Sequence, residues 1–415
     1  MKESKKLRFL DRTLGSFICF IFSRLHFFRP KGRGPVKNIL LIELFEMGVA
    51  TMLNPTVEYI HQKIENPNIY CITLEGMKNS WKRLNVIPDE NIYAISGKNL
   101  FSFCTSLVKQ IHELRKKKID LILDFELFMR IPAMISFMIK SKYRAGFYKY
   151  ELEGLYRGSF YDFKCSFNQN THISKNFLAI TKTALNFEYE YPNYKGNVSS
   201  LELNPPKYYP NPILNKKVKD KIKEVYPEYE SNKIIVIAPD VGGNLAIRNY
   251  PKENFVKVAR SLLDEYQDHL IILCGTRADF NTCAYIKERV ANNRCLNFAG
   301  KTSLDELFEL IHIAELLISN DNGPVHFAAI VQTRTLALFS TDSPFMYGPL
   351  GKKCVILYSF YHCSPCISAF NHKHSKCRNN LCLQTIKPET VIEHVKKMLK
   401  DQVNYGTINN TIPYL

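Results

Sequence analysis

Residues 315–330 read ELLISNDNGPVHFAAI, an order of residue types that indicates an α/β fold. The apolar residues 316–318 predict a short buried strand, and residues 319–323 predict a polar turn. Pro324 predicts the start of a helix, because the fixed φ of proline suits the first helical turn. Such a helix presents backbone N–H groups and the positive end of its dipole to an anion. The sequence therefore predicts an anion site in this turn.

Three polar side chains accompany the predicted anion site. Asp321 and Asn322 lie in the turn, and His326 lies near the start of the helix. They can bind hydroxyl groups or move a proton. A nucleotide that carries a sugar needs both the anion site and side chains of this kind. Asp-Asn-Gly is also an ordinary turn signal, and His326 alone would fit a histidine that is satisfied within its helix.

The length and charge of the chain narrow the class of protein. With 415 residues it exceeds what one hydrophobic core usually supports, so we expect two domains. The 56 Lys and Arg residues outnumber the 39 Asp and Glu residues, which leaves a net charge of +17. This excess favours polyanionic partners. Beyond the N-terminus no basic cluster is interleaved with aromatic residues, so we expect anionic lipid or a phosphorylated substrate rather than nucleic acid.

The N-terminal 37 residues contain ten Lys or Arg residues, two acidic residues and many Phe, Leu and Ile side chains. We expect residues 1–35 to form a basic amphipathic helix that lies on an anionic membrane surface. The apolar run 17–22 is too short to span a bilayer, which takes about 20 residues. Arg24 and the lack of a small-residue cleavage site argue against a secretory signal. A helix packed on the body of the protein is the alternative.

Residues 36–190 predict a doubly wound domain, because a buried strand, a turn, a helix and a second strand follow one another from residue 36. A later strand ends in Asp124 and Glu126, with Arg130 in the next helix and Arg144 on a further strand. Carboxylates at strand ends in such sheets lie beside the ligand, which makes them candidates for binding or acid/base work. Helix capping is the alternative for Asp124.

Residues 191–231 are rich in Tyr, Pro, Asn and Lys and are expected to link the domains, with a helix over 212–224. The second domain, residues 232–415, repeats the strand-turn-helix order. Three of its strand ends carry polar turns, which are Gly242-Gly243 with Arg248, Gly275-Thr276, and Asp321 to His326. Turns of this kind on one sheet edge predict a nucleotide site.

Taken together, these residues resemble glycosyltransferase family nine, the heptosyltransferase-like enzymes of lipopolysaccharide assembly. The segment Asp321-Asn-Gly-Pro-Val-His326 is similar to the Asp-Thr-Gly-x-x-His segment of that family, and Arg248-Asn-Tyr-Pro251 and Arg144-Ala-Gly-Phe147 are also family-like. The resemblance implies a GT-B fold, in which two Rossmann-like doubly wound domains face each other across a cleft. It places the donor in the second domain and the acceptor in the first.

The resemblance also implies roles for single residues. Asp321, Asn322, Gly323 and His326 would hold the diphosphate and sugar of the donor, with Gly242, Gly243, Gly275 and Thr276 beside them, and Arg248 would bind phosphate oxygens. Asp124, Glu126, Arg130 and Arg144 would bind the acceptor. The donor is expected to be ADP-heptose or another nucleotide-activated sugar. Fixed hydrogen-bond donors would stabilise the leaving diphosphate, so no divalent metal or cofactor is expected.

The sequence departs from the family at the predicted base. Family members commonly place an Asp directly after the Gly of the first turn, whereas Val49 follows Gly48 here. We therefore expect Glu46 to act as the base on the acceptor hydroxyl, with Asp124 and Glu126 as rivals and His326 as a second catalytic residue. The missing Asp also fits a nucleotide-binding scaffold of little activity. A GT-B nucleotide-sugar epimerase, which would hydrolyse its nucleotide sugar, is the other alternative.

Four cysteines near the C-terminus have the spacing C-x2-C-x10-C-x4-C; they are Cys363, Cys366, Cys377 and Cys382. With three nearby histidines they could form a structural zinc site. The alternative is a loop whose thiols stay reduced, which suits the scattered cysteines of a cytosolic protein.

The function expected from the sequence is inverting sugar transfer from a nucleotide sugar to a lipid-linked saccharide of lipopolysaccharide or a surface polysaccharide. The enzyme would be cytoplasmic and peripheral on the inner face of the cytoplasmic membrane, held there by its basic N-terminus.

Overall fold

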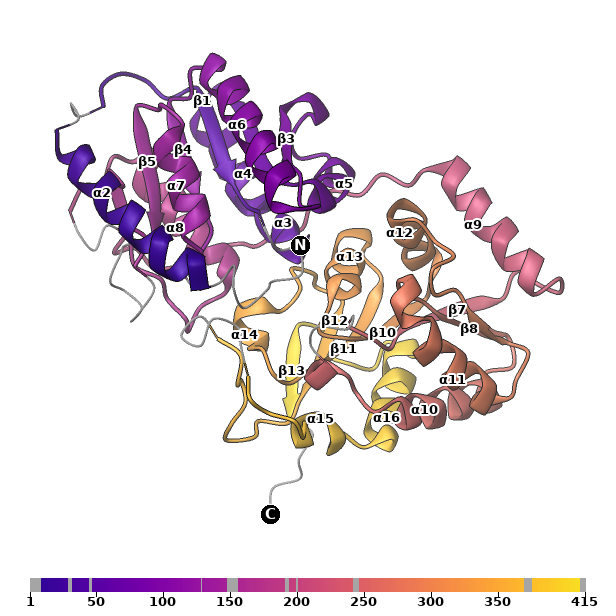
Figure 1. The fold of residues 1–415 in the computed structure, drawn as a ribbon. Helices are drawn as coiled ribbons and strands as arrows, with labels where there is room; N and C mark the ends of the chain where they lie inside the picture. The colour runs from indigo at the N-terminus through magenta and orange to yellow at the C-terminus, as the bar shows by residue number, and fades with distance from the viewer. Residues whose placement is uncertain are drawn as a thin grey trace. The chain divides into compact units, whose positions relative to one another are not determined.

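A computed structural model describes residues 9–28, 32–44, 47–127, 129–147, 156–190, 194–198, 201–241, 246–368 and 375–410. The side chains of residues 47–49 and 410 are outside this description. The chain divides into two compact units, Met1–Pro206 and Lys207–Leu415. They are coloured indigo to magenta and magenta to yellow in Figure 1. Each unit is built on its own parallel sheet.

The sheet of the first unit has the strand order β3-β2-β1-β4-β5-β6, and every pair is parallel. Its strands are β1 Asn38–Ile42, β2 Asn68–Leu74, β3 Ile92–Ile95, β4 Leu121–Asp124, β5 Tyr143–Phe147 and β6 Phe163–Cys165. Its helices are η1 Asp11–Gly15, α2 Ser16–Phe27, α3 Met47–Met52, α4 Asn54–Lys63, α5 Glu75–Leu84, η2 Asp89–Asn91, α6 Leu100–Lys116, α7 Arg130–Met138 and α8 Ile173–Leu185. The strands are almost continuous apolar runs because helices cover both faces of the sheet.

The sheet of the second unit has the order β13-β12-β11-β10-β7-β8-β9 and is also parallel throughout. Its strands are β7 Lys233–Ala238, β8 His269–Leu273, β9 Cys295–Asn297, β10 Leu316–Asn320, β11 Arg334–Phe339, β12 Cys354–Tyr358 and β13 Thr407–Asn410. Its helices are α9 Pro212–Val225, η3 Ala246–Arg248, α10 Lys252–Glu265, η4 Arg277–Asp279, α11 Phe280–Val290, α12 Leu304–Ile313, α13 Gly323–Val331, α14 Pro344–Tyr347, α15 Leu381–Gln384 and α16 Pro388–Leu399.

Each sheet has one switch point, which is a pair of neighbouring strands from which the chain continues in opposite directions. From one strand it continues towards one edge of the sheet, and from the other towards the opposite edge. In the first unit it lies between β1 and β4, and in the second between β7 and β10. The register places Ile42 beside Asp124 and Ala238 beside Ser319, so the carboxyl ends of each pair are level. Ligands of doubly wound sheets bind at the carboxyl ends of such a pair. The predicted pair of doubly wound α/β domains is confirmed.

The segment that was predicted to link the domains contains an ordered helix. The helix expected over 212–224 is α9, and its Lys217 and Lys221 form ion pairs of 2.9 and 2.8 Å with Glu306 of α12. The two units divide at Pro206, so α9 is part of the second unit. Within the described residues, the structure has no helix that combines the length and hydrophobicity needed to cross a membrane.

Candidate functional site

Asparagine and aspartate side chains tie the ends of β7 and β10 together at the switch point of the second unit. Buried Asn320 donates from Nδ2 to the carbonyl of Pro239, 2.8 Å away, and its Oδ1 accepts from the amide of Tyr250. Asp240 accepts from Asn249 Nδ2 at 2.9 Å and from the hydroxyl of Thr282 on α11 at 2.9 Å. The sequence analysis missed this network, although Asp240 lies just after the end of β7 and Asp124 is the last residue of β4.

The turn after β10 holds the predicted motif Asp321 to His326. Asn322 adopts an extended backbone directly before α13 and makes no capping hydrogen bond to that helix. Its side chain instead donates to the carbonyl of Asp240 at 2.8 Å and accepts from the hydroxyl of Ser319 at 2.8 Å. The first turn of α13 therefore keeps the anion-binding character of a helix N-terminus.

Asp321 and His326 are both nearly buried, with exposed fractions of 7% and 6%. The amide of Asp321 donates to the carbonyl of Leu338, which fixes the turn against β11. His326 is the fourth residue of α13, so its backbone lies one turn into the helix. Donor binding by Asp321, Asn322, Gly323 and His326 stays a prediction, and the fold brings these residues to the switch point of the second unit.

Arg248 forms a close ion pair with Asp342, which follows β11. The side chain of Asp342 is 4% exposed and that of Arg248 is 16% exposed, so solvent reaches the guanidinium more than the carboxylate. Arg248 thus lies at the carboxyl edge of the sheet with its charge balanced by a carboxylate. A phosphate group could approach its exposed side. Asp342 was missed because nothing in its local sequence sets it apart from a turn residue.

Of the other four predicted donor residues, the structure describes Gly275 and Thr276. Thr276, which follows β8, donates from its amide and its hydroxyl to the carboxylate of Asp279 at 2.6 and 2.8 Å, so Asp279 caps the N-terminus of η4. Gly275 lies so close to this cap that an added Cβ would be 2.8 Å from the Cβ of Asp279. Gly242 and Gly243 lie outside the described residues. Donor contacts of all four stay predictions.

The strand-end carboxylates of the first unit are buried and hydrogen bonded. Asp124 accepts from Arg157 Nη2 at 2.7 Å and from the hydroxyl of Tyr161 at 2.6 Å. Burial raises the pKa of Asp124 above its ordinary value, against the opposing effects of Arg157 and Tyr161. Glu126 accepts from the amide of Leu44 at 2.7 Å and so joins the end of β4 to the end of β1. Arg157 and Tyr161 were not predicted, because they follow Asp124 by 33 and 37 residues.

The two arginines predicted to bind the acceptor also have partners within the first unit. Arg130 is 2% exposed, donates from Nε to the carbonyl of Tyr156 and lies 3.5 Å from a carboxylate oxygen of Asp11. Arg144 is 3% exposed and donates to the carbonyls of Ser136, Phe137 and Ile139 around the end of α7. These contacts stabilise α7. A role for Asp124, Glu126, Arg130 or Arg144 with an acceptor stays a prediction, as does that of Glu46, which lies outside the described residues.

Cys363, Cys366, Cys377 and Cys382 form no disulfide bond in the structure. Cys377 donates from Sγ to the carbonyl of Asn379, and burial raises the pKa of Cys382. Among the described residues, no group of three or more His, Cys, Asp or Glu side chains could hold a metal ion. Two of the neighbouring histidines, His372 and His374, lie outside that part of the chain. Zinc binding by Cys363, Cys366, Cys377 and Cys382 stays a prediction.

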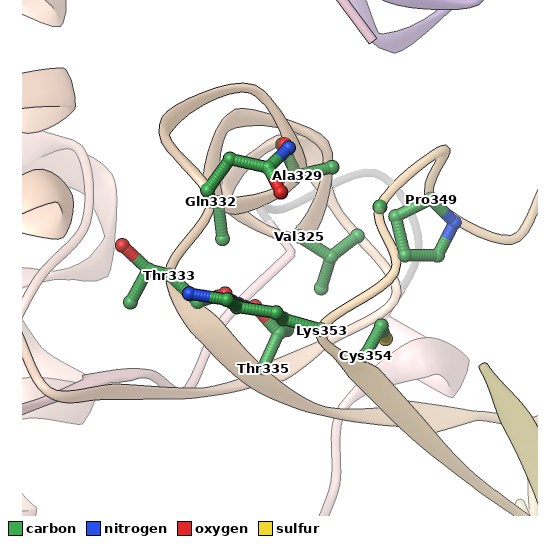
Figure 2. A pocket seen from close by; sticks show the side chains of 10 residues that line it. Val325, Ala329, Gln332, Thr333, Thr335, Pro349, Lys353 and Cys354 are labelled. Carbon is green, nitrogen blue, oxygen red and sulfur yellow. Dashed lines mark hydrogen bonds between the residues drawn. The ribbon is translucent and has the colours of Figure 1, made fainter. Parts of the chain in front are cut away.

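A small cavity lies at the opposite edge of the second sheet. Figure 2 shows it between Val325, Ala329 and Gln332 of the α13 region and Thr335, Lys353 and Cys354 near the first residues of β11 and β12. Its volume is about 10 Å³, far below the about 300–1,000 Å³ of most ligand sites. The cavity is therefore too small for a nucleotide sugar and lies far along the strands from Asp321.

Comparison with known proteins gives three kinds of match. A model of glycosyltransferase family 9 (heptosyltransferase) matches residues 107–376. The chain is 29% identical over 151 residues to lipooligosaccharide heptosyltransferase 2 of Campylobacter jejuni subsp. jejuni serotype O:2, and this match covers 35% of the chain and 45% of that relative. It is 23% identical over 378 residues to lipopolysaccharide heptosyltransferase 1 of Campylobacter coli, which covers 88% of the chain and 100% of the relative.

The match to the Campylobacter jejuni protein thus spans less than half of that relative. Among solved structures, Escherichia coli ADP-heptose lps heptosyltransferase II superposes with a TM-score of 0.67 at 18% identity, covering 88% of this chain and 99% of that one. At this identity the similarity bears on the fold. Together with the two doubly wound sheets, it confirms the predicted GT-B fold.

Proposed function

The chain belongs to glycosyltransferase family 9, the heptosyltransferase family, and from this premise we propose that it moves a sugar from a nucleotide-sugar donor to a lipid-linked saccharide. The sugar is heptose or a related one, and the acceptor belongs to lipopolysaccharide or surface polysaccharide biosynthesis. Relatives named as heptosyltransferases of lipopolysaccharide and lipooligosaccharide support this substrate class. ADP-heptose is accordingly the first donor to test.

One observation carries the proposal, namely the turn Asp321 to His326 at the switch point of the second sheet. The turn follows β10, is fixed to Asp240 and Ser319 through Asn322, and leads into the N-terminus of α13. The diphosphate of the donor would bind at that N-terminus, where backbone N–H groups and the helix dipole favour an anion. Asp321 and His326 would bind the sugar.

The proposed chemistry is an in-line attack of an acceptor hydroxyl on the anomeric carbon, with inversion and release of the nucleoside diphosphate. Negative charge develops on the leaving diphosphate, and Arg248 with the N-terminus of α13 would stabilise it without a divalent metal. A carboxylate must take the proton of the acceptor hydroxyl. We assign this role to Glu46, because Glu126 is hydrogen bonded to the amide of Leu44 and Asp124 to Arg157 and Tyr161.

The proposed location is the cytoplasmic side of the membrane that contains the acceptor lipid, with the protein bound peripherally. The basic N-terminal sequence supports this, because its ten Lys and Arg residues favour an anionic surface. The partners are then the nucleotide sugar, the lipid-linked saccharide and the anionic lipid itself.

The first test is thermal stabilisation of the purified protein by ADP-, GDP-, UDP-, dTDP- and CMP-sugars. A ligand at a hundred times its dissociation constant adds about 2.7 kcal/mol to the stability of the folded state. We expect one nucleotide class to stabilise the wild type and not Asp321→Ala. Lys353→Ala, which changes an exposed residue at the opposite edge of the sheet, is the matched control and should respond as the wild type does.

The second test measures release of nucleoside diphosphate with and without a lipid-linked saccharide acceptor. Transfer requires release that depends on the acceptor and falls at least a hundredfold in Glu46→Gln. Release from UDP-sugar without an acceptor would identify an epimerase-type hydrolysis instead. Binding with no release under either condition would identify the nucleotide-binding scaffold that the Val49 departure also fits.

A further inference from the structure

The N-terminal helical segment, η1 and α2, packs with one face against α7 of the first unit. Asp11, Gly15 and Cys19 are buried, and Phe22 and His26 are partly buried. These positions recur every three or four residues, so they form one stripe along the helix. The segment is therefore an ordered part of the first unit, as the packed-helix alternative expected.

The carboxylate of Asp11 fastens the beginning of this segment to α7. It accepts from the amide of Arg130 at 3.0 Å and from the amide of Ile131 at 3.2 Å, and it lies 3.5 Å from the guanidinium of Arg130. The residue directly before α7, Met129, makes no capping hydrogen bond. Asp11 thus supplies the N-terminal cap of a helix that lies about 120 residues further along the chain.

Close packing extends this attachment along the helix. A Cβ at Gly15 would lie 3.0 Å from the Cβ of Arg130, so glycine allows the two helices to approach closely. Further along, the ring of Phe22 stacks on Phe137 with centroids 4.1 Å apart. The hydroxyl of Ser23 accepts from the amide of Ser159 at 2.8 Å. The helix is consequently held at several points and has a defined orientation on the first unit.

The opposite face of the same segment exposes large apolar side chains. Nine of them are between 40% and 84% exposed; they are Phe9, Leu10, Leu14, Phe17, Phe20, Ile21, Leu25, Phe27 and Phe28. Soluble proteins rarely expose so many neighbouring apolar side chains unless that surface binds a partner or a membrane.

The charges of the segment are divided between its two faces. Asp11, its acidic residue within 9–28, faces α7 and is paired with Arg130, whereas Arg12 and Arg24 are exposed beside the apolar side chains. The flanking sequence adds further basic residues, which are Lys2, Lys5, Lys6, Arg8, Arg29, Lys31 and Arg33. The outer face therefore combines apolar and cationic side chains, the combination that suits an anionic bilayer.

We propose that this outer face is the membrane-docking surface of the protein, which takes anionic phospholipid, and that the Asp11 cap on α7 holds it in a fixed orientation. Phe and Leu side chains enter the interface while Arg12 and Arg24 contact lipid phosphates. Because the helix is fastened to α7 rather than attached by a free tether, docking orients the first unit on the bilayer. This inference deepens the proposed peripheral location and needs no transfer activity for its test.

The experiment is co-sedimentation of the full chain with vesicles of phosphatidylglycerol and phosphatidylethanolamine, compared with vesicles of phosphatidylcholine. The wild type is expected to bind the anionic vesicles at least tenfold more tightly. The triple variant Phe17→Ser, Ile21→Ser, Phe28→Ser should weaken that binding at least about tenfold. The double variant Arg12→Gln, Arg24→Gln should weaken it about tenfold, with a larger effect at low salt.

The matched control is the double variant Phe101→Ser, Val108→Ser on α6, which removes two exposed apolar side chains of the same unit that are 79% and 67% exposed. It should bind vesicles as the wild type does. Fluorescence of Trp81, the single tryptophan, which is fully buried in the first unit, verifies that each variant is folded. Equal binding by the triple variant and the wild type, or no binding of the wild type to anionic vesicles, would overturn the docking surface.

A separate experiment tests whether Asp11 fastens the N-terminal helical segment to α7. In Asp11→Asn, hydrogen exchange of peptides from residues 129–138 should accelerate at least tenfold, because a charged acceptor for the amides of Arg130 and Ile131 is lost. Vesicle binding should stay within about threefold of the wild type, since the outer face is unchanged. Unchanged exchange in this variant would show that Asp11 does not fasten the helix and would overturn that half of the proposal.

Discussion

The switch points of the two sheets have the same topology and different chemistry. At the first, Asp124 and Glu126 are buried and bonded to Arg157, Tyr161 and the amide of Leu44, all within the unit. At the second, asparagine side chains hold the strand ends together, and the ion pair of Arg248 with Asp342 keeps one partner partly exposed. A polar strand end thus serves internal stability in one unit and leaves a basic group accessible in the other.

The difference shows why a strand-end position alone does not identify a binding residue. Both sets of residues lie at or after the carboxyl ends of buried parallel strands and look alike in the sequence. What separates them is whether a partner from elsewhere in the chain already neutralises and covers the side chain. Arg157 does so for Asp124, whereas Asp342 leaves the guanidinium of Arg248 16% exposed.

The largest expected effect is on stability, at the first switch point. Arg157→Met should lower the free energy of unfolding of the first unit by about 3–5 kcal/mol, because Asp124 would be left as a buried carboxylate without its cation. Urea unfolding followed by Trp81 fluorescence measures this unit specifically, since Trp81 is the single tryptophan and is buried there.

The matched control for Arg157→Met is Lys116→Met, which removes an exposed ion pair with Glu113 on α6 of the same unit. It should cost less than about 1 kcal/mol. A loss below about 1 kcal/mol for Arg157→Met as well would contradict the structural role assigned to the Asp124 pair.

The next effect is on ligand binding, at the second switch point. Arg248→Ala should weaken binding of the nucleoside diphosphate about 10- to 100-fold, as loss of a hydrogen bond to a charged group costs about 1.5–3 kcal/mol. Isothermal titration with the nucleotide found by the stabilisation screen measures it. The loss of stability should be smaller than for Arg157→Met, because solvent reaches the Arg248 pair.

Arg260→Ala is the control for this measurement, since Arg260 is an exposed arginine on α10 of the same unit. It removes the same charge from the unit and should leave the dissociation constant unchanged within about threefold. Equal weakening by both variants would mean that net charge, and not the position of Arg248, governs binding.

The smallest effect concerns pH and extends the comparison to a buried carboxylate outside both switch points. Burial by itself would raise the pKa of Glu306, but hydrogen bonds from Lys221, the amide of Ser303 and Lys217 outweigh it and lower the pKa to about 2. Because the folded state holds this proton less tightly than the unfolded state, the stabilisation is present above the ordinary value of 4.5 and is lost as the pH falls towards 2. Asp124, whose pKa is raised, has the opposite dependence.

Glu306→Gln should therefore lower stability by about 1–3 kcal/mol at pH 7, and its difference from the wild type should shrink as the pH falls below 4.5. Urea unfolding followed by far-UV circular dichroism between pH 3 and 7 detects the transition of the second unit, while Trp81 fluorescence identifies that of the first. A difference that stays constant over this range would show that Glu306 does not titrate with a lowered pKa.

The sequence predicted the doubly wound architecture and the position of the main motif, because strand burial and helix starts depend on neighbouring residues. The strand expected at 316–318 is β10, and the helix expected at Pro324 is α13, which begins one residue earlier. Arg248 was expected in a polar turn that follows a strand of the second domain, and the structure has it in η3 between β7 and α10.

The tertiary structure decided which polar side chains have partners, because those partners lie far apart in the chain. Asp11 meets Arg130 across 119 residues, and Arg157 meets Asp124 across 33. The composition of the N-terminal segment indicated an amphipathic helix, whereas only its packing on α7 showed that the acidic residue faces inward and the apolar face outward. Local patterns determine the elements, and burial energies that act between distant residues determine which of their side chains are available for function.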